Sequence, residues 1–116
     1  MKHESLEVYK QSYELALSIY RFCETLPIEE KYGIISQLKR ASLSIPLNIA
    51  EGYGKQSTQA EFNRFLSMAK GSCSEISVLL NFLKDLGQLK EEHCEKYQKR
   101  YEEVEKMLYG LMKRKV

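Results

Sequence analysis

The feature that most constrains the fold is a run of apolar residues that returns every three or four positions from Phe62 to Leu83. The series consists of Phe62, Leu66, Ala69, Cys73, Ile76, Leu80 and Leu83. Steps of three and four keep side chains on one face of an α-helix, whereas a strand needs alternation at every second residue. Thr58 and Glu61 fit a capping box ahead of this run, and Gly87 suits its end. The pattern predicts one long amphipathic helix.

The first and last segments of the chain show the same period. Near the N-terminus, one row of the predicted helix holds Leu6, Tyr9, Tyr13, Ala16, Tyr20 and Cys23, with Ile19 beside it. A second row holds Val8, Leu15, Phe22 and Leu26. Towards the C-terminus, the apolar row consists of Cys94, Tyr97, Tyr101, Val104, Leu108 and Leu111. Ser5 suits the N-cap of the first helix, and the two apolar rows there indicate contact with another helix or another subunit.

The least generic stretch is residues 37–54, because it combines helical periodicity with polar groups and a proline. Its apolar row holds Leu38, Ala41, Ser42, Ile45 and Ile49. A polar row beside it holds Gln37, Arg40, Ser44, Asn48 and Glu51. Pro46 lacks the N–H that would reach the carbonyl of Ser42, so we expect a bend there. Gly52 and Gly54 are expected to stop the helix.

These segments predict four helices in one domain, at about residues 5–25, 29–53, 58–86 and 90–113. A chain of 116 residues has the length of a single domain. Short connections make successive helices antiparallel neighbours. We therefore expect an all-α fold, an antiparallel up-down four-helix bundle.

Composition excludes a membrane protein and indicates a reducing compartment. The hydrophobic fraction is 43%, and no apolar run approaches the roughly 20 residues that span a bilayer. The N-terminus lacks the apolar core of a signal peptide. The three cysteines are an odd number, spaced far apart, which does not fit a disulfide framework. We expect a cytoplasmic protein.

Motifs for metal, cofactor or catalytic chemistry are missing from the sequence. Cys23, Cys73 and Cys94 lie on apolar rows without C-x-x-C spacing, so we expect core residues rather than a zinc or redox site. Neither His3 nor His93 stands three residues after a Glu, as the ligands of a di-iron bundle would. No nucleophile, base and orienting group share a useful spacing. We expect no cofactor and no enzymatic activity.

Charge points to a possible binding region in the middle of the chain. The net charge is +2, but residues 36–74 carry five basic side chains against two acidic ones. The basic side chains are those of Lys39, Arg40, Lys55, Arg64 and Lys70. Because Lys and Arg make the phosphate contacts of nucleic-acid-binding proteins, these five are the candidates for contacting RNA, DNA or an acidic protein partner.

The same region supports two other interpretations. On the predicted third helix, a polar row holds Glu61, Arg64, Gly71, Ser72 and Glu75, so two helices can present polar rows to one surface. Arg40 and Arg64 would then pair with Glu51 and Glu75 in a network that fixes helix register or joins subunits. This network comprises Gln37, Arg40, Ser44, Asn48, Glu51, Arg64 and Glu75. A helix-turn-helix over residues 45–66 is the third interpretation, weakened by the length of its second helix.

Three segments resemble the four-helix-bundle family of 23S rRNA-intervening-sequence proteins. They are SQLKRASLSIPLNIAEGYGKQS, EFNRFLSMAKGSCSEI and, at the opening, LEVYKQSYELALSIY. The residues that match the family's motifs are Gln37, Arg40, Ser44, Pro46, Asn48, Glu51, Gly52, Arg64, Phe65 and Glu75. The resemblance implies a homo-oligomer, a ring-like homopentamer in many members, and brings no established enzymatic activity. A related branch comprises accessory proteins of diversity-generating retroelements, which bind nucleic acid and a reverse transcriptase.

Together, the residues and the resemblance predict a non-enzymatic, oligomeric helical bundle. The leading hypothesis adds weak, sequence-independent RNA binding through the basic residues of the middle region. The alternatives are a protein-interaction scaffold, whose polar row serves subunit or partner contacts, and a helix-turn-helix DNA-binding protein.

Overall fold

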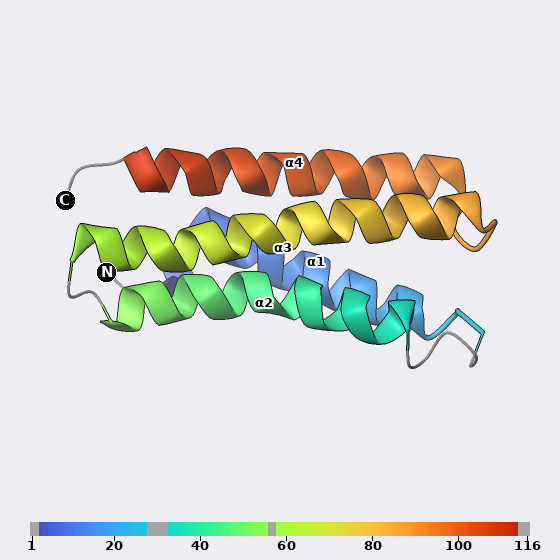
Figure 1. Cartoon of the computed structure of the whole chain (residues 1–116), viewed down its shortest axis with the longest axis horizontal. Coiled ribbons are helices and arrows are strands. Elements are labelled where there is room, and N and C mark those ends of the chain that lie inside the picture. The colour runs from blue at the N-terminus through green and yellow to red at the C-terminus, as the bar shows by residue number, and fades with distance from the viewer. Residues whose placement is uncertain (1–2, 28–32, 56–57, 114–116) are drawn as a thin grey trace.

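The computed structural model describes residues 3–27, 33–55 and 58–113. It contains four long helices, α1 (Glu7–Cys23), α2 (Ile34–Lys55), α3 (Gln59–Asp85) and α4 (Glu91–Lys113). A short 3₁₀ turn, η1 (His3–Ser5), precedes them. The described ranges hold no strand. The expected all-α, four-helix architecture is confirmed (Figure 1).

Successive helices run in opposite directions along an elongated molecule of 45 × 24 × 21 Å. In Figure 1, α2 and α3 lie side by side, α4 lies beyond α3, and α1 lies behind. Neighbours in sequence are neighbours in space, and the largest interface joins α2 to α3. The interface between α1 and α4, which closes the bundle, is the smallest of the four.

All four helices contribute to one core. Its largest fully buried side chains are Tyr101, Leu15, Ile19, Leu38, Ile45, Ile49, Leu66, Ile76, Leu80, Leu83, Leu108 and Val104. The predicted apolar row of α2 is confirmed, because each of its five members is fully buried. The row predicted for α3 is buried from Leu66 onwards, and Phe62 packs against the core while half-buried.

The first apolar row predicted on α1 is buried only in part, since Ala16 and Cys23 are buried while two of its tyrosines are not. Tyr13 and Tyr20 are 47% and 36% exposed, whereas Val8, Ser12, Leu15 and Ile19 are buried. The buried row follows steps of 4, 3 and 4 through a serine, whose hydroxyl donates to the carbonyl of Tyr9 at 3.1 Å. That bond satisfies the polar group inside the core. The core face of α1 therefore combines members of both predicted rows, and Tyr13 and Tyr20 remain at the surface.

The N-terminal ends of α1 and α2 differ from the predicted ones. Ser5 lies in η1, and Leu6 occupies the N-cap of α1 without a side-chain cap bond. In the preceding 3₁₀ turn, the amide of Leu6 donates to the carbonyl of His3 at 3.0 Å. The second helix was expected from residue 29, but residues 28–32 lie outside the described ranges. In the described part, Gly33 forms a turn and α2 begins at Ile34.

Gly52 does not stop α2, contrary to expectation, and neither does Gly54, because the helix continues to Lys55. Gly52 is buried, and a Cβ there would lie 3.3 Å from Phe62 Cδ1 and 3.4 Å from Phe65 Cβ. Its missing side chain therefore lets α2 approach α3 closely. Among the described glycines, only Gly87 has a positive φ, of 78°.

The end of α3 is the one predicted. The amide of Gly87 donates to the carbonyl of Lys84 at 3.0 Å, and the amide of Gln88 donates to that of Leu83 at 2.9 Å. This pair of bonds is a Schellman motif, which needs a left-handed residue at the position of Gly87. At the other end, the Thr58 hydroxyl accepts from the amide of Glu61 at 3.0 Å, so the predicted N-cap is confirmed.

Candidate functional site

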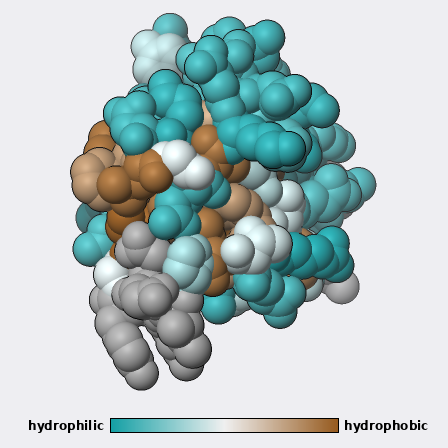
Figure 2. Space-filling view, turned by 90° about the vertical axis from the view of Figure 1, so that its right-hand side faces the viewer, coloured by the Kyte–Doolittle hydropathy of each residue, from teal (hydrophilic) through white to brown (hydrophobic). Residues whose placement is uncertain are grey.

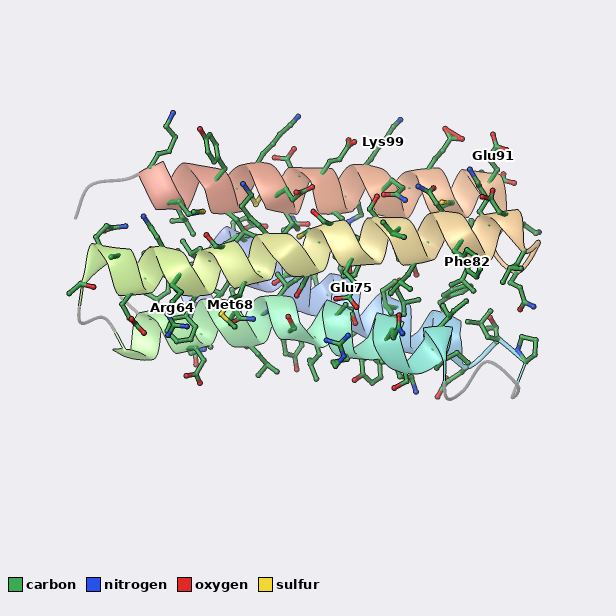
Figure 3. All side chains as sticks on the ribbon, in the orientation of Figure 1. Arg64, Met68, Glu75, Phe82, Glu91 and Lys99 are labelled. Carbon is green, nitrogen blue, oxygen red and sulfur yellow. The ribbon has the colours of Figure 1, made fainter. Side chains whose placement is uncertain are left out.

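The polar rows of α2 and α3 meet along the largest helix interface. Arg40 Nη2 lies 2.9 Å from Glu75 Oε2, and the hydroxyls of Ser44 and Ser72 are 2.5 Å apart. Asn48 lies two residues after Pro46, and its Nδ2 donates to the carbonyl of Ser44 at 2.9 Å. In Figure 3, Glu75 lies between the two ribbons. The Arg40–Glu75 and Ser44–Ser72 contacts join α2 to α3 within one chain, whereas the Asn48–Ser44 bond lies within α2.

Arg64 takes a different partner from the one in the predicted network. Its Nη2 lies 2.6 Å from Glu61 Oε2, one turn earlier on the same helix. That hydrogen bond raises the pKa of Arg64 above its usual value. The guanidinium also lies 4.6 Å from the centroid of the Phe65 ring. Arg64 therefore remains on the surface of α3, in the same row as Met68 and Glu75 (Figure 3). Gln37 and Glu51, the other members of the predicted network, are exposed.

The four candidate phosphate-binding residues whose side chains are described do not form one surface. Lys39 lies over the Tyr20 ring of α1, with Nζ 5.1 Å from the centroid. Lys70 lies over the Tyr109 ring of α4, at 5.0 Å, and Lys113 lies over the same ring at 5.1 Å. Arg40 and Arg64 lie between these two flanks, on the surface shared by α2 and α3. The side chain of Lys55 lies outside the described part.

The two helices of the helix-turn-helix interpretation form a long antiparallel hairpin of the bundle. Helix α3 has 27 residues, and its buried residues extend from Phe65 to Leu83. In Figure 1, α2 and α3 run side by side along their lengths rather than crossing steeply. A helix-turn-helix motif has its two helices at roughly 90–120°. The arrangement of the two helices follows core packing.

A cleft between α1 and α4 was not foreseen from the sequence. It encloses about 330 Å³ and is lined by Ser18, Phe22, Leu89, His93, Lys96, Tyr97 and Arg100. A hydrogen bond of 2.7 Å between the hydroxyls of Tyr97 and Ser18 crosses it. The signal that could have found it is on α4, where His93, Lys96 and Arg100 share one face at steps of 3 and 4 beside Tyr97. What the sequence does not show is that α1 faces this row.

The cysteines and histidines form no metal centre in the described residues, where no group of three potential ligands comes together. All three cysteines are buried with free thiols. Burial is the main cause that raises the pKa of Cys73 to about 12, and burial also raises the pKa of Cys23. Thiols held in the neutral form are poor nucleophiles and poor metal ligands. The expectation that they are core residues is confirmed.

Large apolar side chains remain exposed in two strips, which we name by their helices, and singly at Met68 and Tyr109. The α1/α2 strip consists of Tyr13, Leu17, Tyr20, Leu43 and Leu47. The α3 strip consists of Val78, Phe82 and Leu86. Figure 2 looks onto the end of the bundle where α3 finishes and shows apolar side chains gathered on one side of it. Within the described ranges, no helix is both long and apolar enough to cross a membrane.

Comparisons with known proteins agree with this architecture. Residues 4–110 match the family described as 23S rRNA-intervening sequence protein. A search of curated proteins found no match. Among solved structures, a protein of unknown function from the S23 ribosomal protein family of Bacteroides thetaiotaomicron is 26% identical, with a TM-score of 0.83. That match covers 92% of this chain and 99% of the other. Since the family match spans nearly the whole sequence, this chain belongs to the 23S rRNA-intervening sequence protein family.

Proposed function

We propose that this protein is a non-enzymatic scaffold whose copies join head to tail through the α1/α2 strip and the α3 strip. The observation that carries this proposal is the exposure of the two strips, where Leu47 is 57% and Val78 68% exposed. Monomeric proteins rarely expose contiguous apolar patches beyond a few hundred Å². Continuous apolar surface of this kind is typical of protein–protein interfaces.

The α1/α2 strip is continuous because the two helices are antiparallel neighbours. Lys39 lies over Tyr20, which fixes their alignment at that point. One turn further along α2 and one turn back along α1, the helical repeat brings Leu43 to the level of Leu17. The next turn brings Leu47 to the level of Tyr13. The strip therefore runs for about three turns along one flank.

The two strips differ in shape and position, which favours a head-to-tail contact. The α1/α2 strip spans two helices, and the α3 strip lies on the outer face of a single helix, where its members follow one another at steps of four. A contact between two different surfaces generates a ring when the rotation closes. The sequence resemblance to the family implies ring-like homopentamers, and the chain belongs to that family. This supports a head-to-tail geometry.

Matched charge substitutions test the assembly. Leu17→Glu with Leu47→Glu would disable the α1/α2 strip, and Phe82→Glu would disable the α3 strip, with Tyr109→Glu as a control outside both. We expect each disabled variant to be monomeric by light scattering, and an equimolar mixture of the two to form a dimer with one copy of each. A monomeric wild-type protein at about 100 μM, or unchanged assembly in the disabled variants, would contradict the proposal.

A second candidate function is weak, sequence-independent RNA binding. It is favoured by the ring of Tyr109, which is exposed between the ammonium groups of Lys70 and Lys113. An exposed aromatic ring beside cations is the combination on which unpaired bases stack while phosphates are neutralised. The mild positive charge of the chain limits the affinity to be expected.

A salt titration tests this second candidate. Binding of single-stranded and duplex RNA should weaken steeply as salt rises, and Lys70→Gln should reduce both the affinity and the salt slope. Lys99→Gln, which removes the same charge from the outer face of α4, is the control. Absence of binding at about 50 mM salt, or equal effects of the two substitutions, would rule it out.

A further inference from the structure

The cleft between α1 and α4 has the features of a binding site for a small anion. Three of its seven lining residues are basic and none is acidic. All three project from one face of α4, and His93 belongs to the first turn of that helix. The dipole of the helix N-terminus adds positive potential there, which Glu91 and Glu92 in the same turn partly offset. The whole chain has nearly as many acidic as basic residues, so the excess of basic side chains is a local property of the cleft.

The cations of the cleft are available to a ligand to different degrees. Within the described residues, Lys96 forms no ion pair that would neutralise it. Arg100 contacts Gln11 at 3.2 Å and Glu14 at 4.0 Å, so its charge is only partly compensated. Glu14 is itself well exposed, which weakens that contact through solvent screening. The cleft therefore keeps a net positive charge.

The walls of the cleft are aromatic and fixed in position. Phe22 and Tyr97 both line it and lie next to each other as a tilted pair, with ring centroids 6.3 Å apart. Tyr97 is held by the Ser18 hydroxyl at 2.7 Å, and its hydroxyl also lies 3.3 Å from the Ser18 carbonyl. Leu89, buried in the connection between α3 and α4, closes one end. A ligand would meet flat apolar surface beside a row of positive charge.

The size of the cleft selects the class of ligand. A volume of about 330 Å³ lies at the lower end of the range for small-molecule sites and is too small for a helix or a duplex. A group that suits both walls has one or two negative charges and one flat ring. We propose that the cleft binds a nucleotide, with its phosphate on Lys96 and Arg100 and its base against Phe22 and Tyr97.

This site is independent of the proposed assembly. Around α1, Ser18 and Phe22 lie on the flank towards α4, whereas Tyr13, Leu17 and Tyr20 lie on the opposite flank, as the repeat of 3.6 residues per turn requires. Failure of nucleotide binding would leave the assembly untouched, and a monomeric protein would still contain the whole cleft.

The test is calorimetric titration of the intact protein with adenosine monophosphate, adenosine and inorganic phosphate. Adenosine monophosphate should bind more tightly than either fragment. Lys96→Gln with Arg100→Gln should weaken it by about tenfold or more, because charge-assisted hydrogen bonds are lost. Phe22→Leu should weaken adenosine monophosphate but not inorganic phosphate. Lys99→Gln is the matched control, since its side chain points away from the bundle on the same helix (Figure 3).

The source of the nucleotide is distinguished by a second titration. A short single-stranded oligoribonucleotide with a terminal phosphate is compared with the same strand lacking it. Tighter binding of the phosphorylated strand, lost in the Lys96→Gln, Arg100→Gln variant, assigns the cleft to a strand end; binding of the free nucleotide alone assigns it to a metabolite. No binding of adenosine monophosphate at about millimolar concentration, or equal effects of the cleft substitutions and Lys99→Gln, would overturn the proposal.

Discussion

At the scale of single residues, the core contains polar groups whose ionisation is suppressed by burial. Cys73 is fully buried, and burial and the charge of Glu105 raise the pKa of its thiol to about 12. Tyr101 is 2% exposed, and burial raises the pKa of its hydroxyl as well. That hydroxyl has no hydrogen-bond partner in the described structure. The folded state tolerates such groups in its core only while they remain neutral, because burying an ionised group costs far more than burying a neutral one.

We predict that Cys73 makes stability fall at alkaline pH. The folded thiol titrates near 12 and the unfolded thiol near 9, so its contribution is complete below pH 9 and is lost as the pH rises towards 12. Between pH 8 and 10 the loss is on the order of 1 kcal/mol of unfolding free energy. Cys73→Ala should be less stable at every pH but should lack this part of the decline. Urea unfolding at both pH values measures the difference, and identical declines in the two proteins would contradict the prediction.

At the scale of elements, the packing of α2 against α3 depends on one small residue. A Cβ at Gly52 would lie within 3.3 Å of Phe62, whereas a Cβ at Gly71 in α3 would meet nothing within 4 Å. Both glycines are inside helices, so the helix propensity gained by substitution is similar at the two sites. The difference between the two sites therefore isolates the close approach of the helices.

We predict that Gly52→Val destabilises the protein by about 1–3 kcal/mol, because overpacking forces the two helices apart or displaces Phe62. Gly71→Val should be neutral or slightly stabilising, since valine is the better helix former. Chemical denaturation of both variants provides the measurement. Equal stabilities would show that the contact at Gly52 relaxes without cost.

The elements themselves were largely predictable from the sequence, because a period of three and four residues needs only local information. The buried rows of α2 and α3 and the cap at Thr58 follow from such patterns. Two features did not follow. On α1, the sequence offers two apolar rows, one with tyrosines and one interrupted by Ser12. Which residues of these rows are buried depends on the neighbouring helices that exclude water from them. The sequence predicts that Gly52 ends the helix, whereas in the structure Gly52 allows close contact with Phe62 on another helix.

The candidate sites were less predictable for the same reason. Arg40 and Glu75 are 35 positions apart, and their pairing depends on the register of α2 against α3. The sequence leaves more than one acidic partner open for Arg64, and in the structure it pairs with Glu61 on the preceding turn of the same helix. The cleft is defined by α1 and α4, which are distant in sequence, and by the gap that their small interface leaves. Periodicity on one helix does not report that gap.

At the scale of the whole molecule, the exposed strips link stability to concentration. If subunits bind one another only when folded, assembly stabilises the native state by mass action. We predict that the midpoint of thermal unfolding rises with protein concentration between about 1 and 100 μM. Phe82→Glu should remove this dependence while Tyr109→Glu preserves it. A midpoint independent of concentration in the wild-type protein would indicate that the monomer is the stable unit.

The unequal helix interfaces also order the ways in which the bundle can open. Breaking the contact between α1 and α4 disrupts the fewest residue contacts of the four helix interfaces and requires the Tyr97–Ser18 hydrogen bond to break. The α2–α3 hairpin, with the largest interface, can stay intact during this motion. Amide hydrogens in that hairpin should consequently exchange with solvent more slowly than those of α1 and α4, and a ligand that bridges α1 and α4 would slow exchange on both.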